Sequence, residues 1–492
     1  MPRILLTITA LLSAVVVAAG CGSDSSSSSA PASLAPAGSL FYAEASLHPS
    51  ANQQAAIDSL IEKFPGEGSA GERIRGLLEK GFSEADLGLS YSKDIEPWLG
   101  DEAGFFLTSF SPGDTSGAAL IATDDEDAAR AAIDKAKGGR DASYKGHDYR
   151  TFSDDTAAGV VEGQVVVGSE AGFKAAVDTA EGGDPLEDDD AYQKALDGAA
   201  QERLGFIYVN TPALSKQLKA VGGPFADAFD TPLLATINAT EHGVVVESVL
   251  PKSISSAIPF LGQGGKLAGE LPADSWLALS APDLGDTIDG VLTAFGPQAG
   301  GRDALEQQLQ AATGLDLDKD VLSWMGDWSL FVRGTTVQSL NGALVVETSD
   351  EAASKRFIDK VAALARKAGH VSRTADGYAL RIEALPEAVQ LFQRDGKVVL
   401  AYGASAARDA LDPARRLRDT KGYQDAQQAL GGDYDLALYL SFPQVVSLID
   451  SIAGDNDTWA GIKPYLEPLG ALAAGAKKDG DQLRSAFGIT VR

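Results

Sequence analysis

The sequence predicts an α+β fold built from two tandem copies of one unit, each a mostly antiparallel sheet with helices packed on one face. Three observations predict it. One long motif occurs twice in the chain. The expected strands follow one another across short turns, as antiparallel hairpins require. The regular strand–helix alternation of a doubly wound parallel sheet is missing, so that fold class is disfavoured.

The repeated motif sets the expected domain boundaries. Residues 88–101 (GLSYSKDIEPWLGD) recur without a gap as residues 314–327 (GLDLDKDVLSWMGD), and seven of the fourteen positions are identical. Segments before and after the motif keep their order and spacing in both halves, which indicates an internal duplication. We therefore expect one copy over residues 36–250, a connection over 251–271 and a second copy over 272–492.

Apolar periodicity distinguishes the strands from the helices of the first copy. Short apolar runs bounded by turn residues predict strands, and apolar residues three or four apart predict helices. The acidic run at 124–127 marks a helix start, because acidic side chains favour the positive end of a helix. The predicted strands are 40–45, 104–110, 118–123, 148–152, 157–162, 164–168, 204–209, 233–240 and 243–249, and the predicted helices are 55–64, 71–82, 128–137, 170–180 and 189–199.

The N-terminus carries the most specific signal in the chain. Arg3 and the apolar run 4–19 precede small residues and then Cys21, the single cysteine. This resembles a bacterial lipoprotein signal, in which residues 1–20 are removed and Cys21 receives diacylglycerol and a further acyl chain such as palmitate. An ordinary secretory signal with a stray thiol is the alternative, and Ala18 stands where such signals usually carry Leu. The apolar run is shorter than the ~20 residues that span a bilayer.

Composition narrows the expected partners. Residues 21–35 are rich in Ser, Ala and Pro and predict a flexible tether. The net charge is −28, so binding to nucleic acid or to an anionic lipid surface is disfavoured. Membrane affinity must then come from the acyl chains, which hold an exported protein to the outer side of the cell membrane. Without a second cysteine, the body has neither a disulfide nor a thiolate metal site.

The repeat pattern, the Trp-Leu-Gly-Asp element at residues 98–101 and the lipoprotein start resemble a bacterial family of exported proteins, the domain-of-unknown-function 3352 family. The resemblance covers nearly the whole mature chain. The resemblance implies an exported, membrane-anchored location and the two-copy architecture. It implies no substrate, cofactor or catalytic residue.

Clustered acids are the first candidates for chemistry. Residues 124–127 (DDED) and 187–190 (EDDD) offer the oxygen ligands that calcium prefers, but we expect helix capping at the former and a solvated loop at the latter. Asp101 and Asp327 follow the two Trp-x-Gly elements and could pair as catalytic carboxylates. The alternative, which we favour, is that the tryptophans fill the core and the aspartates bond to backbone.

Other residues with reactive side chains lack the spacing of a site. The four histidines are scattered, which disfavours a zinc site. Ser405 sits one residue short of a Gly-x-Ser-x-Gly elbow, and residues 262–266 (GQGGK) lack the spacing of a phosphate loop. The histidines are His48, His147, His242 and His370.

Two classes of function remain, and we favour the first. It is a non-catalytic envelope lipoprotein, without cofactor or metal, that binds a protein or small molecule, and a groove between the repeats is the expected place for it. The second is a carboxylate-dependent envelope hydrolase. A structural surface spacer is a weaker alternative. An apolar pocket without clustered acids would favour binding.

Overall fold

The structure is a computed structural model that describes most of the chain after residue 29. Cys21, the signal segment and residues 22–29 lie outside the described residues. The described part runs from residue 30 to 492, with gaps at 86, 112–113, 153–154, 198, 200–201, 221–230, 251–264, 296–301, 384, 455 and 480–481.

The described residues fall into two compact units that divide between Glu241 and His242. Unit 1 precedes this point and unit 2 follows it. Strand β10 (Gly243–Leu250), which the sequence placed at the end of the first copy, belongs to unit 2, where it pairs with strand β20 (Gln482–Val491).

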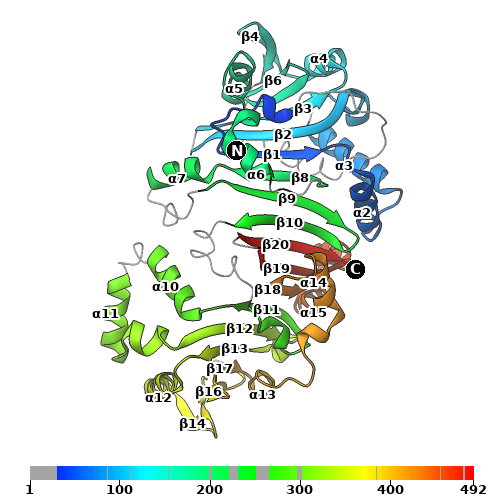
Figure 1. Ribbon diagram of the computed structural model, residues 1–492. Coiled ribbons are helices and arrows are strands. Elements are labelled where there is room, and N and C mark those ends of the chain that lie inside the picture. Colours follow the sequence, from blue (N-terminus) through cyan, green and yellow to red (C-terminus); the bar gives the residue numbers. More distant parts are fainter. Residues whose placement is uncertain are drawn as a thin grey trace. The chain divides into compact units, whose positions relative to one another are not determined.

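Unit 1 contains an antiparallel sheet whose strand order is β9-β8-β1-β2-β3-β7-β6-β5-β4 (Figure 1). Tyr42 at its centre pairs with Phe106 on one side and Tyr208 on the other. The order confirms the predicted antiparallel α+β class. The strands are β1 (Phe41–Ser46), β2 (Leu99–Ser111), β3 (Asp114–Thr123), β4 (Arg140–Tyr144), β5 (His147–Thr151), β6 (Thr156–Val161), β7 (Gln164–Ser169), β8 (Gly205–Val209) and β9 (Leu233–Thr240).

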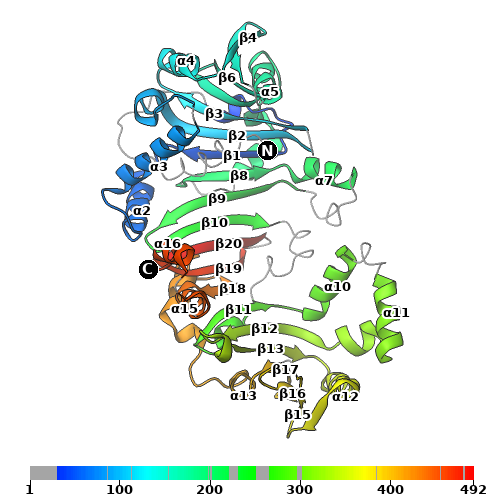
Figure 2. The same ribbon diagram turned by 180° about the vertical axis from the view of Figure 1, so that it is seen from behind.

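Helices cover both faces of the unit 1 sheet, so the expectation of helices on one face is wrong. Val160 packs with Trp98 beneath α4, whereas its neighbour Val161 packs with Phe173 of α5. Successive strand residues point to opposite faces, which places the two helices on opposite sides (Figures 1 and 2). Strand β6 is buried at every position, the pattern of a strand covered on both faces. The helices are α2 (Ala51–Glu62), α3 (Ala70–Glu84), α4 (Glu126–Lys135), α5 (Glu170–Ala180), α6 (Asp190–Asp197) and α7 (Thr211–Ala220).

Unit 2 contains a second antiparallel sheet, ordered β10-β20-β19-β18-β11-β12-β13-β17-β16-β15-β14. Its remaining strands are β11 (Ser275–Ala281), β12 (Met325–Arg333), β13 (Asn341–Thr348), β14 (His370–Arg373), β15 (Gly377–Arg381), β16 (Val389–Arg394), β17 (Lys397–Tyr402), β18 (Asp435–Ser441) and β19 (Leu469–Asp479). Its helices are α10 (Leu284–Phe295), α11 (Arg302–Thr313), α12 (Glu351–Ala368), α13 (Ala404–Asp409), α14 (Lys421–Ala429), α15 (Phe442–Ala453) and α16 (Asp457–Leu466).

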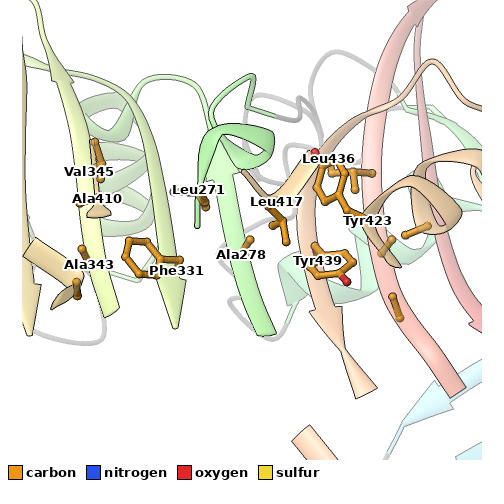
Figure 3. Close-up of a cluster of buried hydrophobic side chains, with 14 of the residues drawn as sticks. Leu271, Ala278, Phe331, Ala343, Val345, Ala410, Leu417, Tyr423, Leu436 and Tyr439 are labelled. Atoms are coloured by element: carbon orange, nitrogen blue, oxygen red, sulfur yellow. The ribbon is translucent and has the colours of Figure 1, made fainter. Parts of the chain in front are cut away.

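The main core of unit 2 lies between one face of this sheet and helices α13 and α14. Phe331 and Ala278 are fully buried there, and the rings of Tyr423 and Tyr439 lie 5.5 Å apart (Figure 3). Helix α12 packs on the opposite face, where Trp324 and Ile358 share a second core. Both faces of this sheet therefore carry helices as well.

The predicted tether and connection are shorter than the sequence indicates. Pro31–Ser33 form a 3₁₀ turn, and Leu34 and Ala35 are fully buried in the core of unit 1. Likewise Ala268–Glu270 form a 3₁₀ turn before Leu271, which is buried in unit 2. Apolar residues scattered among Ala, Ser and Pro gave no periodic signal, and only their burial shows that they belong to the folded units.

Candidate apolar ligand site

The Trp98 element forms the floor of the candidate site. Trp98 is buried, and its indole Nε1 donates to the backbone oxygen of Asp94 at 2.6 Å. The Asp94 carboxylate in turn accepts from the backbone N–H of Ser90 (2.8 Å) and from Lys135 Nζ (2.7 Å). The hydrogen bond from Lys135 first, and then the one from the Ser90 N–H, hold the pKa of Asp94 below its usual range. Trp324 is buried in the same way in unit 2, so the predicted core role of both tryptophans is confirmed.

Above Trp98 lies a cavity of about 180 Å³ inside unit 1. Strands β2, β3, β6 and β7 line one side, and α4 and residues 82–99 line the other. The lining contains no charged side chain and two hydroxyl groups, those of Tyr91 and Thr156. The lining residues are Leu47, Phe82, Ala85, Leu87, Leu89, Tyr91, Ile95, Trp98, Leu99, Ala103, Ala119, Ile121, Ala132, Ile133, Ala136, Phe152, Thr156, Ala158, Val165 and Val167.

Thr156 lies beside the cavity but presents no polar surface to it. The residue is 3% exposed, and its Oγ1 is buried without a hydrogen-bond partner among the described residues. A buried hydroxyl left without a partner costs about 1–3 kcal/mol. Because this oxygen has almost no accessible surface, the surface of the cavity is entirely apolar.

Small side chains on α4 leave the space open. Helix α4 follows the N-cap Asp125, and helix α12 of unit 2 follows the N-cap Asp350. Seven residues after the cap, α4 has Ala132 whereas α12 has Phe357, whose ring lies 5.4 Å from Trp324. In unit 2 an aromatic ring therefore fills the space next to the tryptophan. The corresponding position in unit 1 holds an alanine, so the space there stays open.

The two aspartates proposed as a catalytic pair have separate partners. Asp101 belongs to unit 1, where its carboxylate lies 2.9 Å from His48 Nδ1. Asp327 belongs to unit 2 and accepts from the backbone N–H of Asp283 at 3.4 Å. The expected hydrogen bond to backbone is found for Asp327. For Asp101 the hydrogen bond found is to the side chain of His48 instead.

The acidic runs cap helices. Asp125 accepts from the backbone N–H of Ala128 at 3.0 Å, and Asp350 accepts from Ala352 and Ala353 at 2.9 Å. Both are the predicted caps. Asp189 accepts from the backbone N–H of Tyr192, so part of the run expected to be a solvated loop also caps a helix. Within the described ranges, no group of three or more His, Cys, Asp or Glu side chains is placed to hold a metal ion.

The remaining sequence candidates are dispersed. His147 Nε2 lies 2.9 Å from Glu181, and Ser405 lies in α13. That helix begins after Gly403, whose φ of 93° favours glycine. Residues 262–264 of the glycine-rich loop lie outside the described residues, as does Cys21.

Sequence reasoning missed Glu44, a carboxyl on the core-facing side of β1. Tyr42 Oη donates to it at 2.5 Å, and burial raises the pKa of Glu44 to about 7. Burial and the nearby Asp101 also raise the pKa of Glu102 on the adjacent strand. The signal was available, because strand alternation places Glu44 on the same face as Tyr42.

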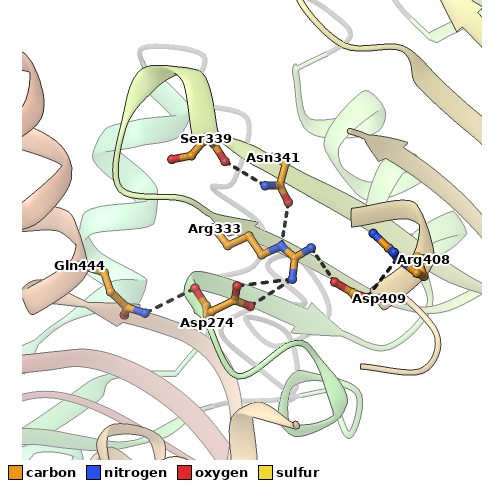
Figure 4. Close-up of polar contacts among 7 residues, drawn as sticks. All are labelled: Asp274, Arg333, Ser339, Asn341, Arg408, Asp409 and Gln444. Atoms are coloured by element: carbon orange, nitrogen blue, oxygen red, sulfur yellow. Dashed lines mark hydrogen bonds and ion pairs between the residues drawn. The ribbon is translucent and has the colours of Figure 1, made fainter. Parts of the chain in front are cut away.

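Unit 2 contains a buried arginine whose role is structural. The Arg333 guanidinium donates to Asp274 (3.1 Å), Asp409 (2.7 Å) and Asn341 (2.7 Å), as Figure 4 shows. These partners lie before β11, at the start of β13 and in α13. Each of the three guanidinium nitrogens is engaged, so the cluster ties these elements together.

The face of the unit 2 sheet opposite the main core carries apolar side chains on eight neighbouring strands, and α12 covers part of it, where Leu344 packs in the second core. The side chains of this face alternate with those of the main core, which point the other way. All of them remain partly or largely exposed. They are Val244, Val246, Phe487, Ile489, Leu472, Ala474, Leu438, Leu440, Leu277, Leu279, Leu330, Val332, Leu344 and Leu400.

The fold and the cavity define an α+β protein with antiparallel sheets and an apolar internal site. The family model described as "Protein of unknown function (DUF3352)" matches residues 6–484, and the chain belongs to this family. No curated protein matches the sequence. Among solved structures, crystal form III of TP0453 is similar at 13% identity and a TM-score of 0.26, covering 46% of this chain and 80% of that one. Crystal form I of TP0453 gives 12% identity and a TM-score of 0.25, covering 46% and 79%. Among the described helices, none is both long and apolar enough to cross a bilayer.

Proposed function

We propose that the protein is an envelope lipoprotein that binds a small apolar molecule in the cavity of unit 1. The observation that carries the proposal is the cavity itself, which is large, uncharged and lined almost entirely by aliphatic and aromatic side chains. In another protein, an apolar cavity of about 150 Å³ stays dry and binds benzene or xenon. The ligand we propose is therefore an aromatic ring or the end of an alkyl chain.

The apolar surface of the cavity adds specificity to this proposal. The Thr156 Oγ1 has almost no accessible surface, so a ligand hydroxyl would find no hydrogen-bond partner in the cavity. Such a hydroxyl would give up its hydrogen bonds to water without replacement. We therefore propose that a hydrocarbon is preferred over the matching phenol or alcohol.

The proposed location at the membrane rests on the N-terminal sequence. A positive residue, an apolar run and a single cysteine are followed by eight residues, 22–29, before Ala30, the first described residue. We propose that Cys21 is acylated and holds the protein at the outer side of the cell membrane. No lipid-facing basic surface is required, which agrees with the net charge of −28.

The proposed origin is a duplication of one unit. From β8 to β4, the strands of unit 1 follow the order β8-β1-β2-β3-β7-β6-β5-β4. From β18 to β14, those of unit 2 follow β18-β11-β12-β13-β17-β16-β15-β14. The two orders correspond strand for strand, which supports the proposal. A binding site in unit 1 alone would then mean that the copies have diverged in function.

Calorimetric titration with benzene and with phenol tests the proposal on the mature chain carrying Cys21→Ser. Benzene should bind, and phenol should bind more weakly, because its hydroxyl finds no partner in the cavity. Ala132→Phe should abolish binding by filling the cavity. Ala131→Phe, at an exposed position of the same helix, should leave binding unchanged.

Thr156→Val tests whether this hydroxyl takes part in binding. It should leave the affinities for benzene and for phenol unchanged. If neither molecule binds the unsubstituted chain, or if Ala131→Phe and Ala132→Phe behave alike, the cavity is not the binding site.

A further inference from the structure

One part of the wall of the unit 1 cavity separates it directly from solvent. The inner walls, such as Trp98 and Ala132, are buried. Residues 87–89 form the wall beside α3 without belonging to a helix or a strand. Leu87 and Leu89 line the cavity and are half-buried, whereas Gly88 between them is exposed. We take this segment as the rim of the cavity.

Lys137 lies against this rim. Its backbone N–H donates to the backbone oxygen of Leu87 at 3.1 Å, and the preceding residue, Ala136, lines the cavity. A Cβ at Gly88 would lie 3.0 Å from Cε and 3.2 Å from Cγ of Lys137, so the alkyl stem of the lysine packs along the glycine. Because Nζ is bonded to Cε, the ammonium group of this exposed residue lies at the rim.

Negative groups close to Lys137 are offset by other cations. The Arg150 guanidinium donates to backbone oxygens at the end of α4, among them that of Ala136 at 3.3 Å, and so offsets the negative end of the helix dipole. The Asp94 carboxylate is paired with Lys135 at 2.7 Å. The rim therefore has a positive charge beside an uncharged cavity, which suits an anionic group on an apolar body.

The corresponding place in unit 2 is built differently. Gly314 occupies the position of Gly88 in the repeated motif, and Lys360 Nζ donates to its backbone oxygen at 2.6 Å. The ring of Phe357 fills the neighbouring space over the tryptophan. In unit 2 the ammonium group thus bonds to the glycine beside a filled core, whereas in unit 1 the stem of Lys137 contacts the glycine beside an open cavity.

We propose that the unit 1 cavity binds the alkyl chain of a medium-chain fatty acid, whose carboxylate lies outside the cavity beside Lys137. The proposal rests on the proposed function and names the class of ligand. A cavity of about 150 Å³ holds benzene, so one of about 180 Å³ holds about six carbons of a chain. A chain of about eight carbons then fills the cavity and places its carboxylate at the rim, where water and the ammonium group replace the partners that the cavity lacks.

Calorimetric titration with octanoate and with octylammonium tests the proposal on the mature chain carrying Cys21→Ser. Octanoate should bind up to about fivefold more tightly, the size of a surface ion pair, although the net charge of −28 alone would favour the cation. Lys137→Glu should reverse this preference. Lys194→Glu is the matched control, because Lys194 is exposed on α6, whose Tyr192 packs in the core of the opposite face, and the preference should stay.

Thermal unfolding shows whether each variant remains folded, and the comparison of the two ligands on the unsubstituted chain needs no variant. If benzene binds but octanoate binds no more tightly than octylammonium, or if a folded Lys137→Glu keeps the original preference, this proposal is wrong and the proposed function stands. Octanoate binding that survives Ala132→Phe would place the chain outside the cavity and overturn the proposal. If neither benzene nor octanoate binds, both proposals fall.

Discussion

At the scale of single residues, Trp98 and Trp324 contribute most clearly to stability. Both are buried, and each indole N–H is satisfied by a backbone oxygen four residues earlier. Replacing a buried Trp by Ala removes its packing and leaves a cavity, at a cost of about 3–5 kcal/mol. We expect Trp98→Ala to destabilise unit 1 and Trp324→Ala to destabilise unit 2, measured by chemical denaturation. Unchanged unfolding of both variants would show that these rings are not core residues.

Glu44 makes stability depend on pH. Its folded pKa is raised by burial from 4.5 to about 7, so the folded protein holds a proton that the unfolded chain has released between these values. The raised pKa does not affect the free energy of unfolding below about pH 4.5. As pH rises from there to about 7, the free energy of unfolding falls by up to about 3 kcal/mol. Glu44→Gln should therefore be more stable than the unsubstituted protein at pH 8 and equal to it at pH 4. Equal stability at pH 8 would contradict the raised pKa.

How well the position of a residue could be predicted from the sequence depended on the chemistry of its side chain. The tryptophans were assigned to the core because large aromatic side chains beside a turn have few other places to lie. The partner of Asp101 could not be predicted, because His48 lies 53 positions away and reaches it only through the pairing of β1 with β2. The same holds for Thr156, which the sequence does not distinguish from any other strand threonine.

At the scale of elements, the acidic residues before α4 and α12 act as caps. Asp125→Ala removes the bond to the Ala128 N–H and should lower the stability of unit 1 by about 1 kcal/mol. Calcium should not change the Tm of either the unsubstituted protein or the variant, measured by thermal unfolding with calcium and with a chelator. A calcium-dependent rise in Tm that Asp125→Ala abolishes would instead indicate a metal site.

Elements were predicted well where one periodicity dominated. Helix 170–180 and strand 164–168 lie within a residue or so of their observed bounds, because their apolar spacing is regular. The faces that the helices cover were not predictable from the same pattern. Strands β6 and β7 are apolar at nearly every position, which fits burial on both faces but does not say which helix covers which.

At the scale of the whole molecule, the proposed anchor at Cys21 would determine where the protein is located. Cys21→Ser should move the protein from the membrane fraction to the soluble fraction after cell fractionation. The membrane form should resist a high-salt wash, because acyl chains and not charges hold it. If Cys21→Ser stays with the membrane after that wash, another part of the chain provides the attachment.

The sequence was informative about architecture and less so about the site. The short turns between the expected strands predicted the antiparallel class, which the sheets confirm, whereas the duplication stays a proposal. The cavity depends on three-dimensional details, namely that α4 presents Ala132 where α12 presents Phe357. A difference of this kind emerges only after the two helices are aligned by their caps.

Xenon binding tests the central claim most directly, because xenon needs only an accessible apolar cavity of sufficient size. Crystals of the mature chain pressurised with xenon should show one anomalous peak in unit 1, between Trp98, Ile121 and Ala132. Crystals of Ala132→Phe should show none at that place. A collapsed cavity, or water ordered throughout it in place of xenon, would contradict the account.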